Sequence, residues 1–198
     1  MRDLNQLLLN FEYKQNFKDE DFYVSKSNYF AFNLIDSWPK WEKNFLNISG
    51  DKFSGKSHLA NIFLKKFKGI KIDANTFKNE KLHEIKVHEN IILENFDQNI
   101  DEVLIYTLFN LIDNDNKYLI INSNIPINEM DFKLNDLKSR TKNCLFAVIE
   151  KPDDDLMFAL ILKNFSDRQI TIDKKLIDFI IKRIDRSYSK IFEFIYKI

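Results

Sequence analysis

An eight-residue segment, Gly50-Asp51-Lys52-Phe53-Ser54-Gly55-Lys56-Ser57, matches the complete phosphate-binding pattern G-x-x-x-x-G-K-[ST]. The chain contains only three glycines, and two of them occupy the glycine positions of this pattern, Gly50 and Gly55. Glycine lets consecutive backbone N–H groups turn toward an anion, so the segment predicts a loop that holds phosphate oxygens. Such a loop follows a strand and begins a helix, which restricts the possible folds.

The residues on both sides of this loop have the required patterns. Residues 45–48 are a short apolar run, typical of a buried strand, and residues 58–67 carry apolar side chains at helical spacing. This order favours a nucleotide site over a surface turn that spells the motif by chance. In such a site Lys56 is expected to contact the β- and γ-phosphates and Ser57 to hold Mg²⁺, while the helix N-terminus adds partial positive charge.

Beyond the loop, predicted strands and helices alternate, which favours an α/β fold with a parallel five-stranded sheet flanked by helices. The predicted strands are 45–48, 70–72, 90–95, 118–121 and 145–149, and the predicted helices are 27–38, 58–67, 76–87 and 101–113. After Pro152 the pattern changes to helices alone, at 153–165, 174–184 and 187–198. Three helices in so short a segment are expected to lack a core of their own and to pack on the α/β part as a lid.

The change of pattern predicts three parts: a flexible tail at 1–20, a nucleotide-binding α/β domain at 21–151 and a helical lid at 152–198. The tail is polar apart from Gln6-Leu7-Leu8-Leu9-Asn10-Phe11. From its spacing alone, this hexamer is either an edge strand that packs on the domain or a linear motif that inserts into a groove on a partner.

The predicted strand at 90–95 ends in Glu94 and Asn95, about forty residues after the loop, as the Walker-B strand of nucleotide-hydrolysing proteins does. In such a strand the first acidic residue holds Mg²⁺, and the second, usually Asp or Glu, activates the attacking water. Glu94 can fill the first role. Asn95 can orient a water molecule but cannot take its proton.

A polar cluster, Asn122-Ser123-Asn124, follows the predicted strand at 118–121. The carboxyl ends of parallel strands are where α/β folds bind ligands, so Asn122 or Asn124 can contact the γ-phosphate. A plain turn before Pro126 is an equally good interpretation.

Charge and composition exclude several classes of function. Thirty basic residues balance thirty acidic ones, so we expect neither direct sequence-specific DNA binding nor membrane binding. The longest apolar run, 156–162, is far shorter than the roughly 20 residues of a membrane span. The single cysteine, Cys144, fits a cytoplasmic protein and borders an apolar segment, so we expect a buried core residue and not a reactive thiol.

The order of these motifs resembles the AAA+ ATPase module of the replication initiator DnaA, and most closely the short Hda-type regulators of that family. The phosphate loop runs into His58-Leu59, as in the family, and the resemblance adds His58 to the nucleotide-binding residues. It also assigns Asn124 to the sensor 1 cluster. Asp136-Leu137-Lys138-Ser139-Arg140 resembles the segment that ends in the family's arginine finger, which implies that Arg140 acts in trans on a neighbour's nucleotide.

The resemblance carries two further implications and two departures. It implies that Gln6, Leu7, Leu9 and Phe11 dock on the DNA polymerase sliding clamp, and that the initiator's DNA-binding domain is absent. The first departure is Ser189, which stands where sensor 2 normally supplies an arginine and leaves Arg186 or Lys190 as replacements. The second is Asn95.

We therefore expect a regulator of replication initiation that binds ATP or ADP with Mg²⁺, docks on the clamp and presents Arg140 to ATP held by DnaA. Its own ATP hydrolysis is expected to be weak or absent, and it is a possible homodimer. One alternative is a self-sufficient AAA+ ATPase such as a helicase loader. Another is a P-loop kinase, for which the sequence offers no substrate-binding segment.

Overall fold

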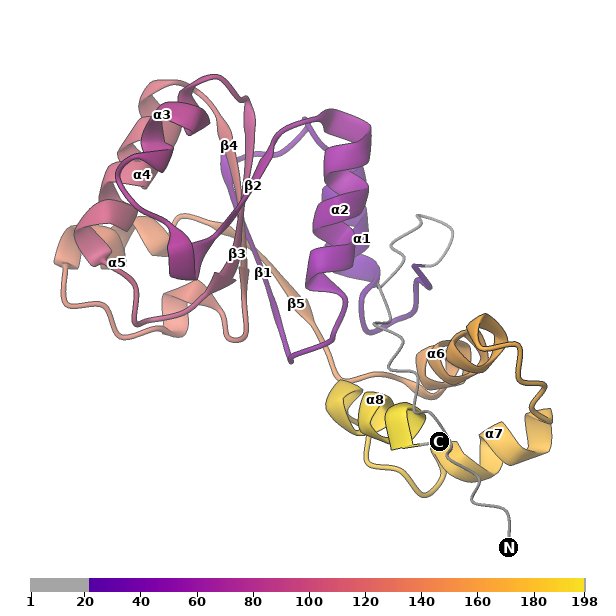
Figure 1. Ribbon diagram of the computed structural model, residues 1–198. Coiled ribbons are helices and arrows are strands. Elements are labelled where there is room, and N and C mark those ends of the chain that lie inside the picture. Colours follow the sequence, from indigo (N-terminus) through magenta and orange to yellow (C-terminus); the bar gives the residue numbers. More distant parts are fainter. Residues whose placement is uncertain (1–21, 198) are drawn as a thin grey trace, which may run out of the picture.

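The computed structural model describes residues 22–197 and contains, within them, one five-stranded parallel sheet (Figure 1). Its strands are β1 (Phe45–Gly50), β2 (Ile70–Asp73), β3 (Asn90–Phe96), β4 (Tyr118–Ser123) and β5 (Leu145–Ile149). They lie in the order β2-β3-β4-β1-β5, so β1 and the loop after it lie inside the sheet. The predicted fold class is confirmed.

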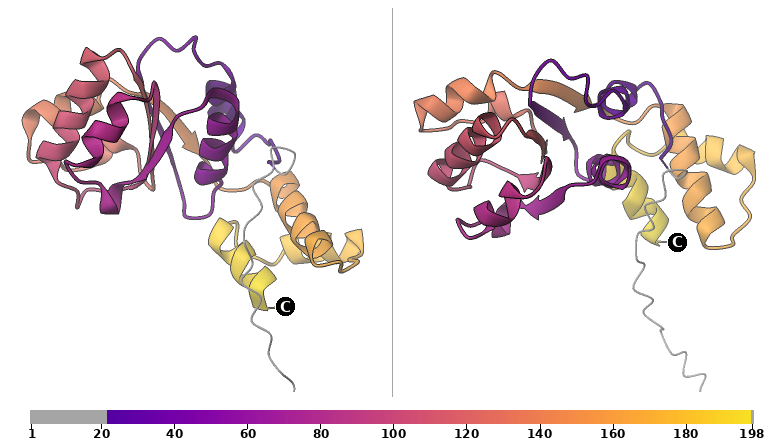
Figure 2. Two further views of the ribbon diagram at one scale, coloured as in Figure 1. Left: turned by 45° about the horizontal axis from the view of Figure 1, so that its top comes forward. Right: turned by 90° about the horizontal axis from the view of Figure 1, so that it is seen from above.

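Helices cover both faces of the sheet (Figures 1 and 2). One face carries α1 (Tyr29–Asp36) and α2 (Lys56–Phe67), and the other carries α3 (Lys81–Lys86), α4 (Glu102–Asn114) and α5 (Asn135–Thr141). Two short 3₁₀ helices, η2 (Ala74–Thr76) and η3 (Ile127–Glu129), follow β2 and β4. The predicted helix at 76–87 is shorter than expected, because residues 77–80 form a loop between η2 and α3.

Each face of the sheet has its own apolar core. Side chains of β3 and β4 pack against α4 through residues such as Leu108, Phe109 and Ile112, which are fully buried. On the other face, Ile48 of β1 packs with Leu59 and Phe63 of α2. The two cores hold the sheet in place. Because β3, β4 and β1 are parallel neighbours, their carboxyl ends meet at one edge of the sheet.

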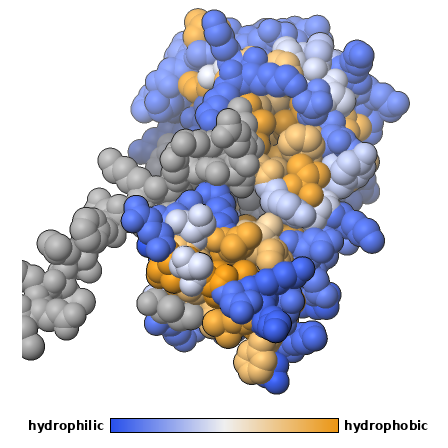
Figure 3. Space-filling model, turned by 90° about the vertical axis from the view of Figure 1, so that its right-hand side faces the viewer, coloured by the Kyte–Doolittle hydropathy of each residue, from blue (hydrophilic) through white to orange (hydrophobic). Residues whose placement is uncertain are grey.

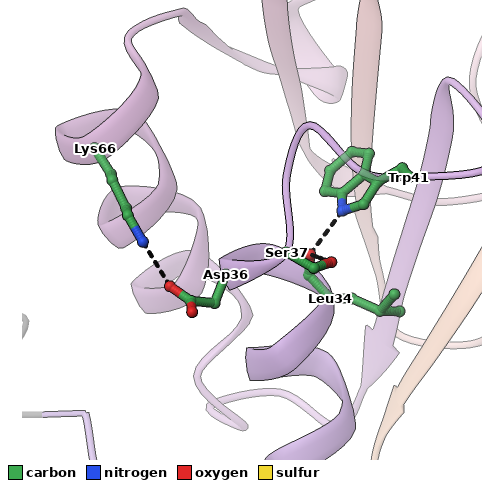
Figure 4. Close-up of polar contacts among 5 residues, drawn as sticks. All are labelled: Leu34, Asp36, Ser37, Trp41 and Lys66. Carbon is green, nitrogen blue, oxygen red and sulfur yellow. Dashed lines mark hydrogen bonds and ion pairs between the residues drawn. The ribbon is translucent and has the colours of Figure 1, made fainter.

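Polar contacts join the end of α1 to its surroundings (Figure 4). The indole Nε1 of Trp41 and the hydroxyl of Ser37 both donate to the carbonyl oxygen of Leu34, at 2.6 and 2.9 Å. Lys66 of α2 forms an ion pair with Asp36 at 2.6 Å. These contacts satisfy a carbonyl at the helix end and hold α1 beside α2.

Three C-terminal helices follow the last strand: α6 (Asp154–Asp167), α7 (Lys174–Ile181) and α8 (Tyr188–Lys197), together called the lid. Asp153 caps α6 by accepting the N–H of Leu156 at 2.8 Å. The expectation that these helices lack a core of their own is wrong. Six apolar side chains are buried among them: Met157, Ile161, Phe165, Ile177, Ile191 and Ile195.

This core is small, and the lid also leaves apolar side chains outside it. Hydrophobic residues gather on the lid's surface in Figure 3, and Leu162, Leu176 and Phe179 are 43, 50 and 51% exposed. Tyr188 joins the lid to the main core, because its buried hydroxyl donates to the carbonyl oxygen of Glu150 at 3.0 Å. Burial raises the pKa of Tyr188 to about 12.

Two further expectations concern burial and length. Cys144 is 3% exposed, and burial raises the pKa of its thiol to about 12, so the prediction of a core residue is confirmed. Among residues 22–197, none of the helices has the length and apolar character that crossing a bilayer requires.

Candidate functional site

The phosphate loop connects β1 to α2, and both of its glycines are sterically required. A Cβ on Gly50 would lie 2.9 Å from the carbonyl oxygen of Ile149, because these two residues pair in neighbouring strands. Gly55 has φ of +98°, in the left-handed region that favours glycine, and begins α2 as its N-cap. The loop therefore turns tightly at the helix N-terminus, where backbone N–H groups are available to an anion.

The side chain of Lys56 lies across this loop. Its Nζ donates to the carbonyl oxygens of Gly50 and Asp51, at 2.6 and 2.8 Å. Burial lowers the pKa of Lys56, while the charges of Glu94 and Asp51 oppose that shift. These hydrogen bonds hold the amine at the loop. A phosphate bound there can take the place of the carbonyl oxygens as its partner.

Ser57 and Glu94, the two predicted Mg²⁺ ligands, are in direct contact. The hydroxyl of Ser57 donates to Oε2 of Glu94 at 2.9 Å. Glu94 is 7% exposed, and its buried Oε1 has no hydrogen-bond partner among the described residues. A hydroxyl and a carboxylate are hard oxygen donors, so these two residues fit Mg²⁺ bound beside a phosphate.

Asn122 is the second-last residue of β4, and Asn124 directly follows the strand at the same edge of the sheet. Asn122 is 1% exposed, and neither atom of its side-chain amide has a hydrogen-bond partner among the described residues. Asn124 is exposed. Both line the same cavity. Burying an amide without a hydrogen-bond partner costs free energy. The position of Asn122 therefore favours a polar ligand at this edge over a plain turn.

Asn47, a fully buried residue of β1 that the sequence did not single out, fixes this segment. Its Nδ2 donates to the carbonyl oxygen of Ile121 and to Oγ of Ser123, both at 2.9 Å. Its Oδ1 accepts the N–H of Ile127 at 2.9 Å. Asn47 thereby ties the strand before the phosphate loop to the end of β4.

Replacing Asn47 with alanine is expected to lower the free energy of unfolding by about 2 to 3 kcal/mol, because it leaves the buried N–H of Ile127 without its acceptor and removes two other buried hydrogen bonds. Urea denaturation measures the change. Asn44→Ala is the matched control, since the amide of Asn44 makes an exposed contact with Asn116 at 3.2 Å. Equal losses for the two variants would contradict the role of Asn47.

Asn95 has an unusual backbone. It lies at an irregularity in the pairing of β3 with β4, between Leu93 and Phe96, and has φ of +56°. Asparagine tolerates this left-handed conformation better than most residues. Its Nδ2 donates to Oδ2 of Asp73 at the end of β2, at 2.7 Å. Asp73 is a second polar residue that the sequence did not single out, although it directly follows the predicted strand at 70–72.

The phosphate loop, the start of α2 and the ends of β3 and β4 line a cavity of about 490 Å³. This volume is within the usual size range of ligand sites. The predicted site residues that line it are Lys52, Phe53, Ser54, Gly55, Lys56, Ser57, His58, Glu94, Asn95 and Asn124. His58 meets the ring of Phe22 edge-on, with centroids 5.3 Å apart. The lid closes one side, where the ring of Phe53 contacts Phe192 of α8 with centroids 5.3 Å apart.

The structure does not bring the predicted sensor 2 residues to this cavity. Arg186 forms an exposed ion pair with Asp154 at 2.8 Å, and Lys190 pairs with Glu193 at 2.9 Å. Neither is among the lining residues. The lid lysine that does line the cavity is Lys163 of α6.

Arg140 also lies outside the cavity, on α5 at the far face of the sheet (Figure 1). Its guanidinium forms an ion pair with Asp113 and lies over the ring of Tyr106, 5.3 Å from the centroid. The side chain is 31% exposed. The predicted clamp-binding residues Gln6, Leu7, Leu9 and Phe11 lie outside the residues that the structure describes.

No family model matches the chain. It is 26% identical over 198 residues to the chromosomal replication initiator protein DnaA of Borreliella afzelii, a match that covers 86% of this chain and 41% of that protein. The fold is similar to AMPPCP-bound DnaA from Aquifex aeolicus, with TM-score 0.70 and 20% identity. The match covers 87% of this chain and 61% of that one. It is also similar to domain III of Thermotoga maritima DnaA, with TM-score 0.69 and 18% identity. That match covers 88% of this chain and 84% of the other. The chain thus spans about two fifths of the length of the curated relative.

Proposed function

We propose, because the chain is related to the AAA+ module of the initiator DnaA, that it binds ATP or ADP with Mg²⁺ and regulates replication initiation. One observation carries the nucleotide part of this proposal. Four polar residues line one cavity at the phosphate loop: Lys56 and Ser57 at the start of α2, Glu94 of β3 and Asn122 of β4. The unpartnered atoms of Glu94 and Asn122 suit Mg²⁺ and a phosphate-bound water.

In this proposal the chain retains its nucleotide and hydrolyses it slowly. Asn95 lines the cavity in place of a second acidic residue, and an amide cannot accept the proton of the attacking water. Arg186 and Lys190 are both engaged by acidic residues of the lid. The chain therefore lacks two groups that fast hydrolysis uses in related ATPases.

Arg140 is proposed to act on a partner's nucleotide. It is too far from its own cavity to line it, and its partly exposed guanidinium is already held on α5 by Asp113 and Tyr106. A preorganised guanidinium loses little conformational freedom when it meets phosphate charge. The proposed target is ATP bound to DnaA, whose hydrolysis the chain stimulates.

The sliding clamp is proposed to bring the two proteins together through the N-terminal segment. Gln6→Ala/Leu9→Ala is expected to reduce capture of the purified chain on immobilised clamp by at least about tenfold, since anchor side chains dominate such peptide contacts. Asn10→Ala, in the same segment, is the matched control. Unchanged capture of the double variant would remove the clamp from the proposal.

Calorimetric titration with ATP and ADP in the presence of Mg²⁺ tests the nucleotide site directly. The regulatory part is tested by ATP hydrolysis of purified DnaA with clamp and this chain present together or singly. Stimulation that needs both proteins supports the proposal. Fast hydrolysis by the chain alone, rising with its own oligomerisation, would instead favour a self-sufficient ATPase such as a helicase loader.

A further inference from the structure

The contact between Asp73 and Asn95 joins two strand ends at the edge of the cavity. Asp73 pairs with Glu94 in the register of β2 and β3, so it is the neighbour of the proposed Mg²⁺ ligand on the adjacent strand. Asn95 follows Glu94 and lines the cavity. The left-handed backbone of Asn95 directs its side chain toward Asp73, whose Oδ2 lies 2.7 Å from Nδ2.

The second oxygen of Asp73 is also occupied. Its Oδ1 accepts the backbone N–H of Asn75 at 2.9 Å and the side-chain Nδ2 of Asn75 at 3.0 Å. These hydrogen bonds and that from Asn95 lower the pKa of Asp73, which is therefore a carboxylate at neutral pH. An ionised carboxylate only accepts hydrogen bonds, so the atom of Asn95 that meets it must be the amide nitrogen.

This arrangement leaves the amide oxygen of Asn95 as the group not engaged by Asp73. We propose that Asp73 is a positioning residue, which fixes the amide of Asn95 so that its oxygen accepts a hydrogen bond from the water next to the terminal phosphate. The inference rests on the proposed nucleotide site. The amide orients that water without removing its proton, and the nearby negative charge of Asp73 strengthens Oδ1 as an acceptor.

Asp73 also explains why an acidic residue does not fit at position 95. Asn95→Asp would place a second carboxylate oxygen where Nδ2 now lies, about 2.7 Å from Oδ2 of Asp73. Two carboxylates at that distance repel each other, so the side chain at position 95 would turn away from Asp73. It would then no longer be held toward the water. Removing the charge of Asp73 at the same time relieves this conflict.

A set of variants tests the pairing by single-turnover hydrolysis of ATP with Mg²⁺, with nucleotide affinity measured for each by calorimetry. Asn95→Asp alone removes the hydrogen bond to Asp73 and is expected to hydrolyse ATP at least about fivefold more slowly than the unmodified chain. Asp73→Asn/Asn95→Asp restores the hydrogen bond with the carboxylate at position 95 and is expected to be about 10²-fold faster, the lower end for a general base. Asp73→Glu/Asn95→Asp keeps the conflict and is expected to stay slow.

Asp97→Asn/Asn95→Asp is the matched control, because Asp97 also lines the cavity and its Oδ1 accepts the backbone N–H of Asn99 at 2.7 Å. Equal rates for Asn95→Asp, its Asp97→Asn double variant and its Asp73→Asn double variant, with nucleotide bound, would overturn the role of Asp73. Absence of nucleotide binding in the unmodified chain would instead overturn the proposed function, and this inference with it.

Discussion

Lys56→Ala is expected to weaken the binding of ATP with Mg²⁺ by at least about 100-fold in calorimetric titration. In a phosphate loop this amine is the positive charge that contacts the β- and γ-phosphates. Lys56 is partly buried beside the loop, where a charge interacts more strongly than it does in water. Its Nζ already lies within 2.6 to 2.8 Å of two loop carbonyls, so little movement is needed to reach an anion.

Lys52→Ala is the matched control for this prediction. Lys52 belongs to the same loop and lines the same cavity, but its amine lies over the ring of Phe53, 5.3 Å from the centroid. Its loss is expected to change affinity by less than about fivefold. Because burial disfavours the charged form of Lys56, its replacement is not expected to lower the free energy of unfolding. Equal affinity losses in the two variants would contradict a specific role for Lys56.

Arg140→Ala is expected to reduce clamp-dependent stimulation of DnaA's ATP hydrolysis by about 10³-fold, the lower end of the effect of arginine fingers in related systems. The physical reason is loss of a guanidinium that neutralises charge on the transferring phosphate. Nucleotide binding by the chain itself should be unchanged, since Arg140 lies outside its cavity. Initial rates of phosphate release from DnaA measure the effect.

Two controls separate this role from a loss of structure or of charge. Arg183→Ala removes a guanidinium that lies over the ring of Phe179 on the lid, 3.5 Å from the centroid, and is expected to leave stimulation intact. Asp113→Asn removes the ion pair but keeps the Arg140 guanidinium over Tyr106, so the loss of stimulation should be far smaller than in Arg140→Ala. Full stimulation by Arg140→Ala would exclude the proposed action in trans.

The α/β core could be predicted because its determinants are local in sequence. Apolar runs such as 90–93 and 118–121 fill buried strands, and the spacing in 102–114 gives one apolar face to α4. The two glycines of the loop predicted its tight turn at the start of α2, where Gly55 has φ of +98°. The extent of the helix predicted at 76–87 was wrong because its weak periodicity did not reveal the loop at 77–80.

The residues that sequence reasoning missed owe their roles to partners far away in the chain. Asn47 acts through Ile127, and Asp73 through Asn95, pairs that only the sheet brings together. The same limit applies to the lid, whose core forms from side chains on three helices that have no fixed spacing relative to one another. Arg186 was predicted to replace the sensor 2 arginine from its position near Ser189. Its ion pair with Asp154 could not be predicted from that position.

The contact between Phe53 and Phe192 joins the phosphate loop to the last helix of the lid. Because Phe53 belongs to the loop itself, the position of the loop sets part of the surface on which α8 packs. Tyr188 holds the same helix to Glu150 after β5, so α8 is tied both to the loop and to the end of the sheet.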